Sequence, residues 1–287
     1  SACLPNSTYP APCPEGTYQD SIGQSSCKVT ELVQTEEFTL NNQTQVCEEG
    51  FYCPPNTSNP EICPAGSYCP AGTRYANEFL CPNGTYSNVT GLTRVDNCTT
   101  CTPGYYCGSR GLTEPTGNCS SGFFCGGGSS VSTPFDSSKT NYRVSYIGET
   151  CVSVLNTTQN DICPPGHYCP AGSAAPTQCP AGTNSSSPGL VSVEDCPPCT
   201  RGFYCPLNGT VFATRKCLAG YYCHDGTADI TTAITCPTGS YCPEGSVDPI
   251  PCAAGTYQDQ QGMPSCDTCP AGYFCLQNTT TPEICPA

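Results

Sequence analysis

The apolar positions of the chain form short clusters and no long stripe. Pro and Gly interrupt each segment before a helical period of 3.6 residues can develop, so helix signals are nearly absent. Apolar and polar residues alternate around Tyr142, Val144 and Tyr146, as in a half-buried strand, and a second strand is expected around Glu36–Leu40. The pattern predicts a mostly irregular chain with short β-hairpins and almost no helix.

One motif, Cys-x-x-Gly-x-(Tyr/Phe)-Cys, recurs along the chain and indicates a repeat protein. Its nine copies occupy residues 47–53, 63–69, 101–107, 119–125, 163–169, 199–205, 217–223, 236–242 and 269–275. The glycine can adopt a positive φ and turn the chain tightly between two cross-links. We expect a small disulfide-rich fold, an elongated linear array in which each module contacts only its neighbours and the motif rings pack against disulfides.

A longer form of the motif starts Cys-x-x-Gly-Thr and reaches its next cysteine after 13 or 16 residues. We favour one bridge within each long form, at Cys13–Cys27, Cys81–Cys98, Cys179–Cys196 and Cys252–Cys266. Two schemes stay open for the short motifs, because connectivity cannot be deduced from spacing. One scheme crosses paired motifs, as in Cys101–Cys119 with Cys107–Cys125, or Cys199–Cys217 with Cys205–Cys223. The other joins neighbouring motifs, as in Cys205–Cys217 and Cys223–Cys236.

The composition predicts an extracellular or cell-surface protein. The 29 cysteines among 287 residues mark a disulfide scaffold, and disulfides persist outside the cell and in secretory compartments. Because the cysteine count is odd, at least one is free or bonds outside these residues; Cys3, Cys151 and Cys275 are the candidates. Sequons for N-glycosylation predict the same compartment. They lie at Asn6, Asn42, Asn56, Asn83, Asn88, Asn97, Asn118, Asn156, Asn184, Asn208 and Asn278.

Charge and motif chemistry exclude several classes of function. A net charge of −14 argues against nucleic-acid binding, and no apolar stretch or leader predicts a membrane span in these residues. The CxxC pairs at 98–101, 196–199 and 266–269 are interpreted as structural bridges, and not as zinc or redox sites. His167 and His224 are interpreted as exposed spacers. We therefore predict no catalytic residue, no metal, no cofactor and no enzyme.

The long form followed by CxxC resembles a known extracellular module. Residues 252–275, CAAGTYQDQQGMPSCDTCPAGYFC, are similar to the ephrin-receptor-like cysteine-rich repeat, a family similar in turn to tumour necrosis factor receptor and EGF-like modules. The resemblance covers most of the chain outside 28–46 and 126–150 and implies a rod of small β-hairpin modules. The many extra copies of the short motif depart from receptor modules and fit large repetitive surface proteins better.

A larger order of repeats divides the chain into five parts. Residues 1–62 hold N-terminal modules with an insertion at 28–46, and 63–125 form a first repeat unit. A Gly/Ser-rich insertion with the strand-like segment spans 126–162. Second and third units span 163–235 and 236–287, and we expect that the third is cut within a repeat.

These features together predict a secreted or cell-surface structural glycoprotein. We expect it to assemble with copies of itself, head-to-tail or laterally, into a filament, coat or appendage. The insertions 28–46 and 126–150 are interpreted as surface loops or as contact elements for a neighbouring chain or module. The alternative is a ligand-binding or adhesion ectodomain of a membrane receptor.

Overall fold

The computed structural model describes residues 46–286 except 56, 58, 136–141 and 156–159. The expected strand near Glu36–Leu40 and the favoured bridge Cys13–Cys27 lie outside these residues, as does Cys3. The described part contains no α-helix, and its helical turns are the 3₁₀ segments η1 (Val95–Asn97) and η2 (Val193–Asp195). The prediction of a disulfide-rich fold of short strands is confirmed.

Nearly all the strands are two-residue segments paired antiparallel in two-stranded sheets. The first strand of each pair follows a motif glycine, and the second directly precedes the first cysteine of the next motif. The pairs are β1 (Phe51–Tyr52) with β2 (Glu61–Ile62), β3 (Thr85–Tyr86) with β4 (Thr99–Thr100), β5 (Tyr105–Tyr106) with β6 (Gly117–Asn118), β7 (Phe123–Phe124) with β10 (Asp161–Ile162), β11 (His167–Tyr168) with β12 (Thr177–Gln178), β13 (Phe203–Tyr204) with β15 (Arg215–Lys216), β16 (Tyr221–Tyr222) with β17 (Ile234–Thr235), β18 (Ser240–Tyr241) with β19 (Ile250–Pro251), β20 (Thr256–Tyr257) with β21 (Asp267–Thr268) and β22 (Tyr273–Phe274) with β23 (Glu283–Ile284).

We call a module the segment from the first cysteine of a motif, short or long, to the residue before the next such cysteine. Backbone hydrogen bonds join each module to the next through the motif glycine, the two motif cysteines and a second glycine that follows the first cysteine by nine or ten residues. The junction between the modules that start at Cys199 and Cys217 shows the four bonds. The motif glycine makes two of them: Gly202 N–H donates to Cys223 O (N···O 2.8 Å), and Gly202 O accepts from Cys217 N–H (2.9 Å). In the other two, Gly226 N–H donates to Cys199 O (2.9 Å) and Cys205 N–H donates to Thr227 O (3.0 Å).

This junction recurs with the same four bonds at each step from Cys47 to Cys119 and at each step from Cys163 to Cys269, with Asn278 in place of the second glycine at the last step. The second cysteine is replaced by Ser87, Ser185 and Gln258 in the described long forms, and these residues make the same backbone bonds. Because the bonds use only main-chain atoms, the variable side chains of a module do not alter the stacking rule.

The glycines are required by both their dihedral angles and their surroundings. Gly220 has a φ of +86°, and a Cβ built on it would lie 2.2 Å from the carbonyl oxygen of Gly262, the second glycine two modules further on. Gly202 approaches Gly245 O in the same way, with a φ of +80° and a Cβ distance of 2.8 Å. These modules therefore contact the second module ahead as well as the next one, through atoms that only glycine leaves accessible, so the expectation that each module contacts only its neighbours is wrong.

The buried residues of the modules are mainly cysteines, with few large apolar side chains among them. One cluster joins Phe124 to Cys163 and Cys169, and another packs Phe51 on the bridge between Cys47 and Cys53. Most described modules thus bury their own disulfide, and in these two clusters an aromatic ring packs against it, as the sequence predicts.

Contacts divide the chain into two compact units. Unit 1 contains residues 1–119 and 125–134, and unit 2 contains 120–124 and 135–287. Within unit 1 the described modules run from Cys47 to Cys119, and within unit 2 they run from Cys163 to Cys269. The five-part division drawn from sequence repeats stays a prediction.

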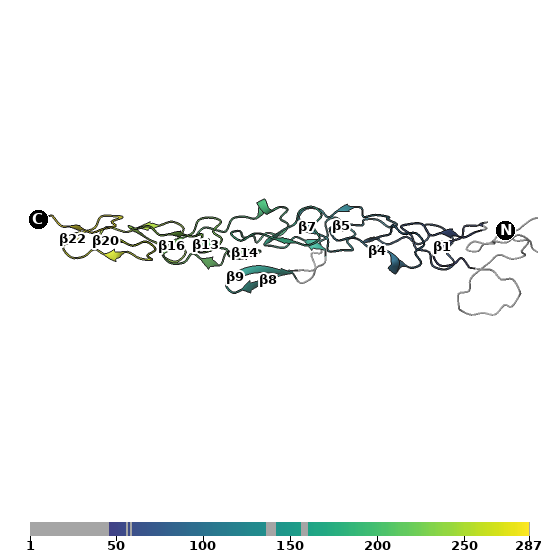
Figure 1. Cartoon of the computed structure of the whole chain (residues 1–287), viewed down its shortest axis with the longest axis horizontal. Coiled ribbons are helices and arrows are strands. Elements are labelled where there is room, and N and C mark those ends of the chain that lie inside the picture. Colours follow the sequence, from purple (N-terminus) through teal and green to yellow (C-terminus); the bar gives the residue numbers. More distant parts are fainter. Residues whose placement is uncertain (1–45, 56, 58, 136–141, 156–159, 287) are drawn as a thin grey trace, which may run out of the picture. The chain divides into compact units, whose positions relative to one another are not determined.

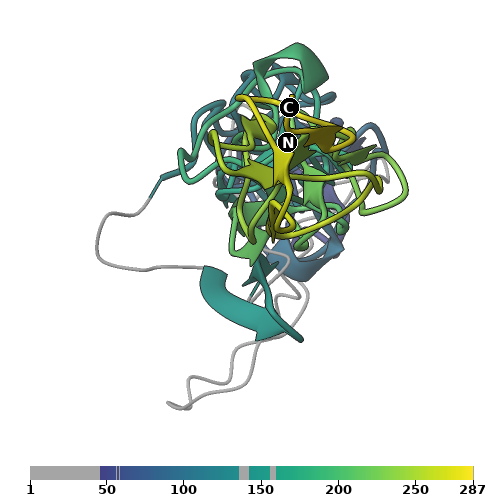
Figure 2. The same ribbon diagram turned by 90° about the vertical axis from the view of Figure 1, so that its left-hand side faces the viewer.

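Unit 2 also contains one longer hairpin, which comes from the Gly/Ser-rich insertion. Strands β8 (Tyr142–Ile147) and β9 (Thr150–Leu155) pair along their full length, and β14 (Thr210–Phe212) adds to the other edge of β9. The resulting sheet has the order β14-β9-β8. The hairpin lies beside the modules of unit 2, next to β14 (Figures 1 and 2). The alternating pattern correctly predicted the strand β8, which pairs with β9, and the other edge of β9 pairs with β14 in a module of the same chain.

Candidate functional site

The disulfide framework corrects part of the predicted pairing. Each of the nine short motifs closes on itself, with a sequence separation of 6 between its two cysteines. The crossed pairs Cys101–Cys119, Cys107–Cys125, Cys199–Cys217 and Cys205–Cys223 are therefore wrong, and so are Cys205–Cys217 and Cys223–Cys236. The physical reason is the turn at the motif glycine, which brings the Cα atoms of Cys101 and Cys107 to 5.8 Å.

The long forms carry the bridges that the sequence favoured. The structure joins Cys81 to Cys98, Cys179 to Cys196 and Cys252 to Cys266, with sequence separations of 17, 17 and 14 residues. The signal that identifies both kinds of bridge is position seven of the motif. Where that position is not cysteine, as at Ser87, Ser185 and Gln258, the first cysteine pairs with the first half of the following CxxC. Where it is cysteine, the motif closes locally.

Two cysteines of the described residues are free, Cys151 and Cys285. Cys151 is one of the three expected candidates, whereas Cys275 is bonded to Cys269, so that expectation is wrong. Cys151 is buried on β9, and burial raises the pKa of its thiol. The sequence did not single out Cys285, which is exposed and starts a CPA sequence like that at Cys63.

The sequon asparagines that the structure describes are mostly exposed. Exposed positions are Asn83, Asn88, Asn97, Asn118, Asn208 and Asn278. Asn184 is half-buried, and its Oδ1 atom has no hydrogen-bond partner. The sequons at Asn6, Asn42, Asn56 and Asn156 lie outside the described residues. The exposed side chains leave room for a bulky sugar, and the glycans themselves stay a prediction.

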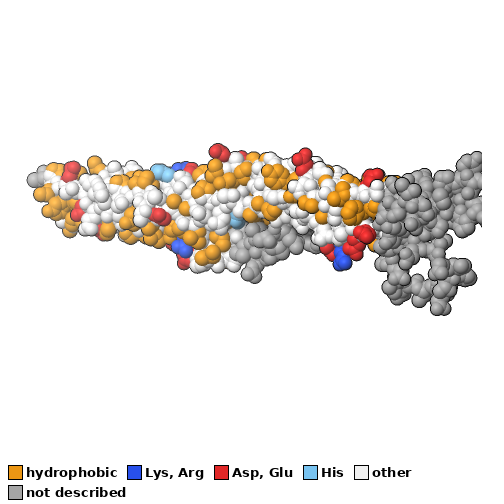
Figure 3. Space-filling model, turned by 45° about the vertical axis from the view of Figure 1, so that its right-hand side comes forward, with side chains coloured by type: hydrophobic (Ala, Val, Ile, Leu, Met, Phe, Trp, Pro, Cys, Tyr) orange, Lys and Arg blue, Asp and Glu red, His pale blue; other side chains and the backbone are white. Residues whose placement is uncertain are grey.

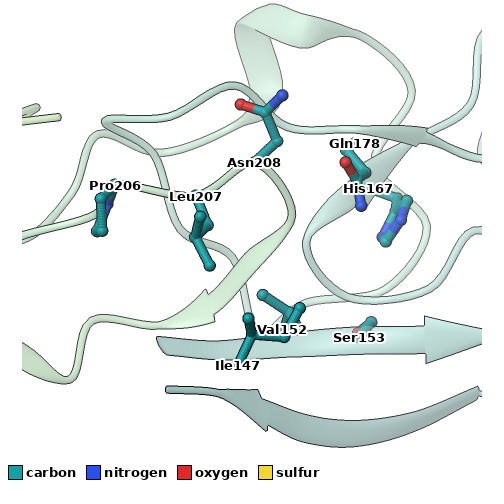
Figure 4. Close-up of a pocket in the computed structure, with 8 residues that line it drawn as sticks. All are labelled: Ile147, Val152, Ser153, His167, Gln178, Pro206, Leu207 and Asn208. Carbon is teal, nitrogen blue, oxygen red and sulfur yellow. The ribbon is translucent and has the colours of Figure 1, made fainter. Parts of the chain in front are cut away.

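A cleft of about 610 Å³ lies between the hairpin and the modules of unit 2. Its walls come from β9 and the end of β8, from β11 and β12, and from the loop before β14 (Figure 4). The lining residues are Ile147, Val152, Ser153, His167, Gln178, Pro206, Leu207 and Asn208. None of them carries a fixed charge. The cleft therefore offers apolar walls with neutral hydrogen-bonding groups, a combination that suits an uncharged polar ligand.

Two polar groups of the cleft are deeply buried. Ser153 is 6% exposed, and its hydroxyl has no hydrogen-bond partner. His167 is 4% exposed, so the expectation that it is an exposed spacer is wrong; the hairpin β8–β9, which shortly precedes it in the sequence, folds back beside it. Its Nδ1–H donates to Pro165 O at 3.1 Å, which leaves Nε2 as an acceptor in the neutral ring. Burial lowers the pKa of His167 because the charged form loses water.

The hairpin is attached to the modules by polar contacts as well as by strand pairing. The Arg215 side chain donates from Nε to Thr150 Oγ1 at 2.9 Å, and the Thr214 hydroxyl donates to Glu149 O. These contacts hold the turn between β8 and β9 beside β15, while β14 pairs with the first half of β9. His224, in contrast, is exposed as expected and packs edge-on against Tyr222 with 5.3 Å between ring centroids.

Charged side chains are sparse on the face of the molecule in Figure 3 and are separated by apolar and neutral ones. An ion pair in unit 2 joins Arg201 to Asp248 at 3.9 Å, and both side chains are at least half exposed. No helix within the described ranges has the length and apolarity to cross a membrane. Nor do His, Cys, Asp and Glu side chains of those residues gather in a cluster that could hold a metal ion.

Comparison with known proteins adds no identification to this geometry. No family model matches the chain, and a search of curated proteins finds no relative. The function of the chain is therefore inferred from the module junction, the sequons and the cleft.

Proposed function

We propose that this chain is a secreted or cell-surface structural glycoprotein, a subunit of an extracellular filament, coat or appendage. The observation that carries the proposal is the module junction, in which the same four main-chain bonds recur irrespective of the intervening sequence. A stack built by such a rule can be extended module by module without redesigning its interior. Its side chains stay available for sugars and for contacts with other chains.

The disulfides support an extracellular setting for that role. Because most of the described modules have a buried bridge, the stack does not depend on a large apolar core, and such bridges form and persist in oxidising compartments. Exposed sequon asparagines in both units are compatible with a sugar coat around the modules. The proposal assigns the chain no catalytic role.

The hairpin β8–β9 provides a lateral contact surface for a second copy. β8 is the outer strand of its sheet, and an outer strand presents backbone groups that can pair with another chain. Tyr146 on β8 is 66% exposed, which adds an apolar side chain to that edge. The resemblance to ephrin-receptor-like repeats supports modular stacking, although receptor function does not follow from it.

Electron microscopy and sedimentation of the glycosylated chain over a range of concentrations test the proposal. We expect ordered assemblies that a Tyr146→Lys variant weakens, because a charge then faces the contact. Leu276→Lys is the matched control, since Leu276 is equally exposed at 66% and lies away from the hairpin in the sequence. Dispersed monomers at every concentration would contradict the proposal and favour the receptor-ectodomain alternative.

A further inference from the structure

The cleft beside the hairpin has the size and the walls of a small-molecule site. Its volume of about 610 Å³ lies within the range of roughly 300–1,000 Å³ that such sites occupy. In Figure 4, His167 and Gln178 lie on one side of the space, Leu207 lies on the opposite side, and Val152 forms the floor on β9. Polar groups therefore line one wall, and aliphatic side chains line the floor and the other wall.

The polar wall is a cross-strand pair. His167 of β11 is directly opposite Gln178 of β12 in the antiparallel register, so the two side chains lie on the same face of the strand pair. His167 is 4% exposed, and its Nδ1–H is used by Pro165 O. No described residue forms a hydrogen bond with its Nε2 atom or with the Gln178 amide. Two adjacent neutral groups are therefore available to a ligand, a ring nitrogen that accepts and an amide that both donates and accepts.

The chemistry of the walls selects an uncharged ligand that carries hydroxyl groups. Because burial holds the pKa of His167 below its ordinary value, the ring is neutral at neutral pH. A charged ligand would lose water in the cleft without gaining a counter-ion. A vicinal diol fits the polar wall, because one hydroxyl donates to His167 Nε2 and its neighbour bonds the Gln178 amide. The C–H face of a sugar ring would then pack on Val152 and Leu207.

We propose that this cleft binds an uncharged sugar unit, held by His167 Nε2 and the Gln178 amide and packed on Val152 and Leu207. The unit is a free neutral saccharide or the outer sugar of a glycan on another molecule, two sources that present the same chemistry. It is not the chain's own sugar at Asn208, because the Asn208 amide points away from Val152 in Figure 4. This binding activity goes beyond the structural role proposed above and does not depend on it.

Calorimetric titration and saturation-transfer NMR on the whole folded chain test this proposal, with the methyl glycosides of N-acetylglucosamine, galactose and mannose as probes. We expect at least one probe to bind, and His167→Phe to weaken its binding about tenfold because the acceptor is lost. Phe51 and Phe203 occupy the same motif position in other copies, so the variant keeps a residue that this turn accepts. His224→Phe is the matched control, since His224 is exposed and does not line the cleft.

Gln178→Ala covers the case in which His167→Phe fails to fold, because Gln178 is exposed and its loss should weaken binding without disturbing the module. Binding of the chain to immobilised glycans, displaced by the free probe, would identify a glycan on another molecule as the source; binding of free probes alone would identify a free saccharide. Absence of binding by every probe at millimolar concentration overturns the proposal, as does binding that His167→Phe and His224→Phe change equally. Neither result bears on assembly, which tests the structural role separately.

Discussion

The close contact between a motif glycine and the module two steps further on can be separated from the dihedral requirement by comparing Gly220 with Gly226, the second glycine of the same module. Both have positive φ, +86° and +82°, and both donate a junction bond through their backbone N–H. A Cβ at Gly220 would lie 2.2 Å from Gly262 O, whereas a Cβ at Gly226 would meet no atom closer than 3.7 Å. Gly226→Ala therefore tests the dihedral angle alone, and Gly220→Ala tests the angle together with the contact.

The expected magnitudes differ accordingly. An L-residue in the left-handed region costs about 1–2 kcal/mol, which is the whole expected loss for Gly226→Ala. At Gly220 the backbone must also move, because a carbon cannot lie 2.2 Å from a backbone carbonyl oxygen. Forced overpacking of this kind typically adds about 1–3 kcal/mol. We expect Gly220→Ala to loosen the modules around Cys217 and Cys236, and Gly226→Ala to affect its own module moderately.

Hydrogen exchange read module by module is the suitable assay, since the disulfides stay intact and local opening free energies can be compared. In Gly220→Ala, faster exchange should extend to the second glycine at Gly262, which loses its close contact. Equal changes in the two variants would refute the reasoning, because the contact across two modules would then contribute nothing beyond the turn.

The remaining predictions concern the bridges and the buried histidine. Replacing Cys179 and Cys196 by serine should lower local stability by about 3 kcal/mol, because that bridge closes a loop of 17 residues in the unfolded chain. Replacing Cys217 and Cys223 should lower it by about 2 kcal/mol, because that loop has 6 residues and constrains the unfolded chain less. Local hydrogen exchange measures both losses. Burial lowers the pKa of His167 in the folded chain below its ordinary value of 6.5. The stabilisation that the neutral ring gives to the hairpin is therefore fully present above pH 6.5. It is lost as the pH falls from 6.5 toward the pKa of the folded chain. The protection factors of the β9 amides, from which the intrinsic pH dependence of exchange is divided out, should therefore fall on mild acidification. His167→Phe, which places the Phe of other motif copies there, should remove that fall, and protection factors that do not change with pH would contradict the burial argument. Complete reduction and alkylation should abolish protection in all modules, and a chain that kept its exchange pattern would show that the bridges are dispensable.

The short hairpins and the long-form bridges of this protein can be predicted from its sequence. The repeated motif and the scarcity of large apolar residues predict disulfide-centred hairpins, because a glycine turn and two cysteines act within seven residues. The bridge between Cys81 and Cys98 could be favoured because the long form has no cysteine at Ser87. The crossed pairing of Cys101 with Cys119 failed because it treated neighbouring motifs as partners, when the turn at Gly104 already brings Cys101 to Cys107.

Tertiary structure alone decided where the inserted hairpin docks and what it covers. The alternation around Tyr146 predicted a strand, but strand pairing between β9 and β14 joins residues about sixty positions apart, and no local pattern specifies such a partner. The burial of His167 follows from that docking, as does the cleft that Ser153 and Asn208 line. By itself the sequence determined the short hairpins and the long-form bridges, because the residues involved lie close along the chain. The closure of each short motif was decided by the turn at its glycine, and the site depended on the tertiary fold, because its walls come from segments that meet only when the hairpin reaches β14.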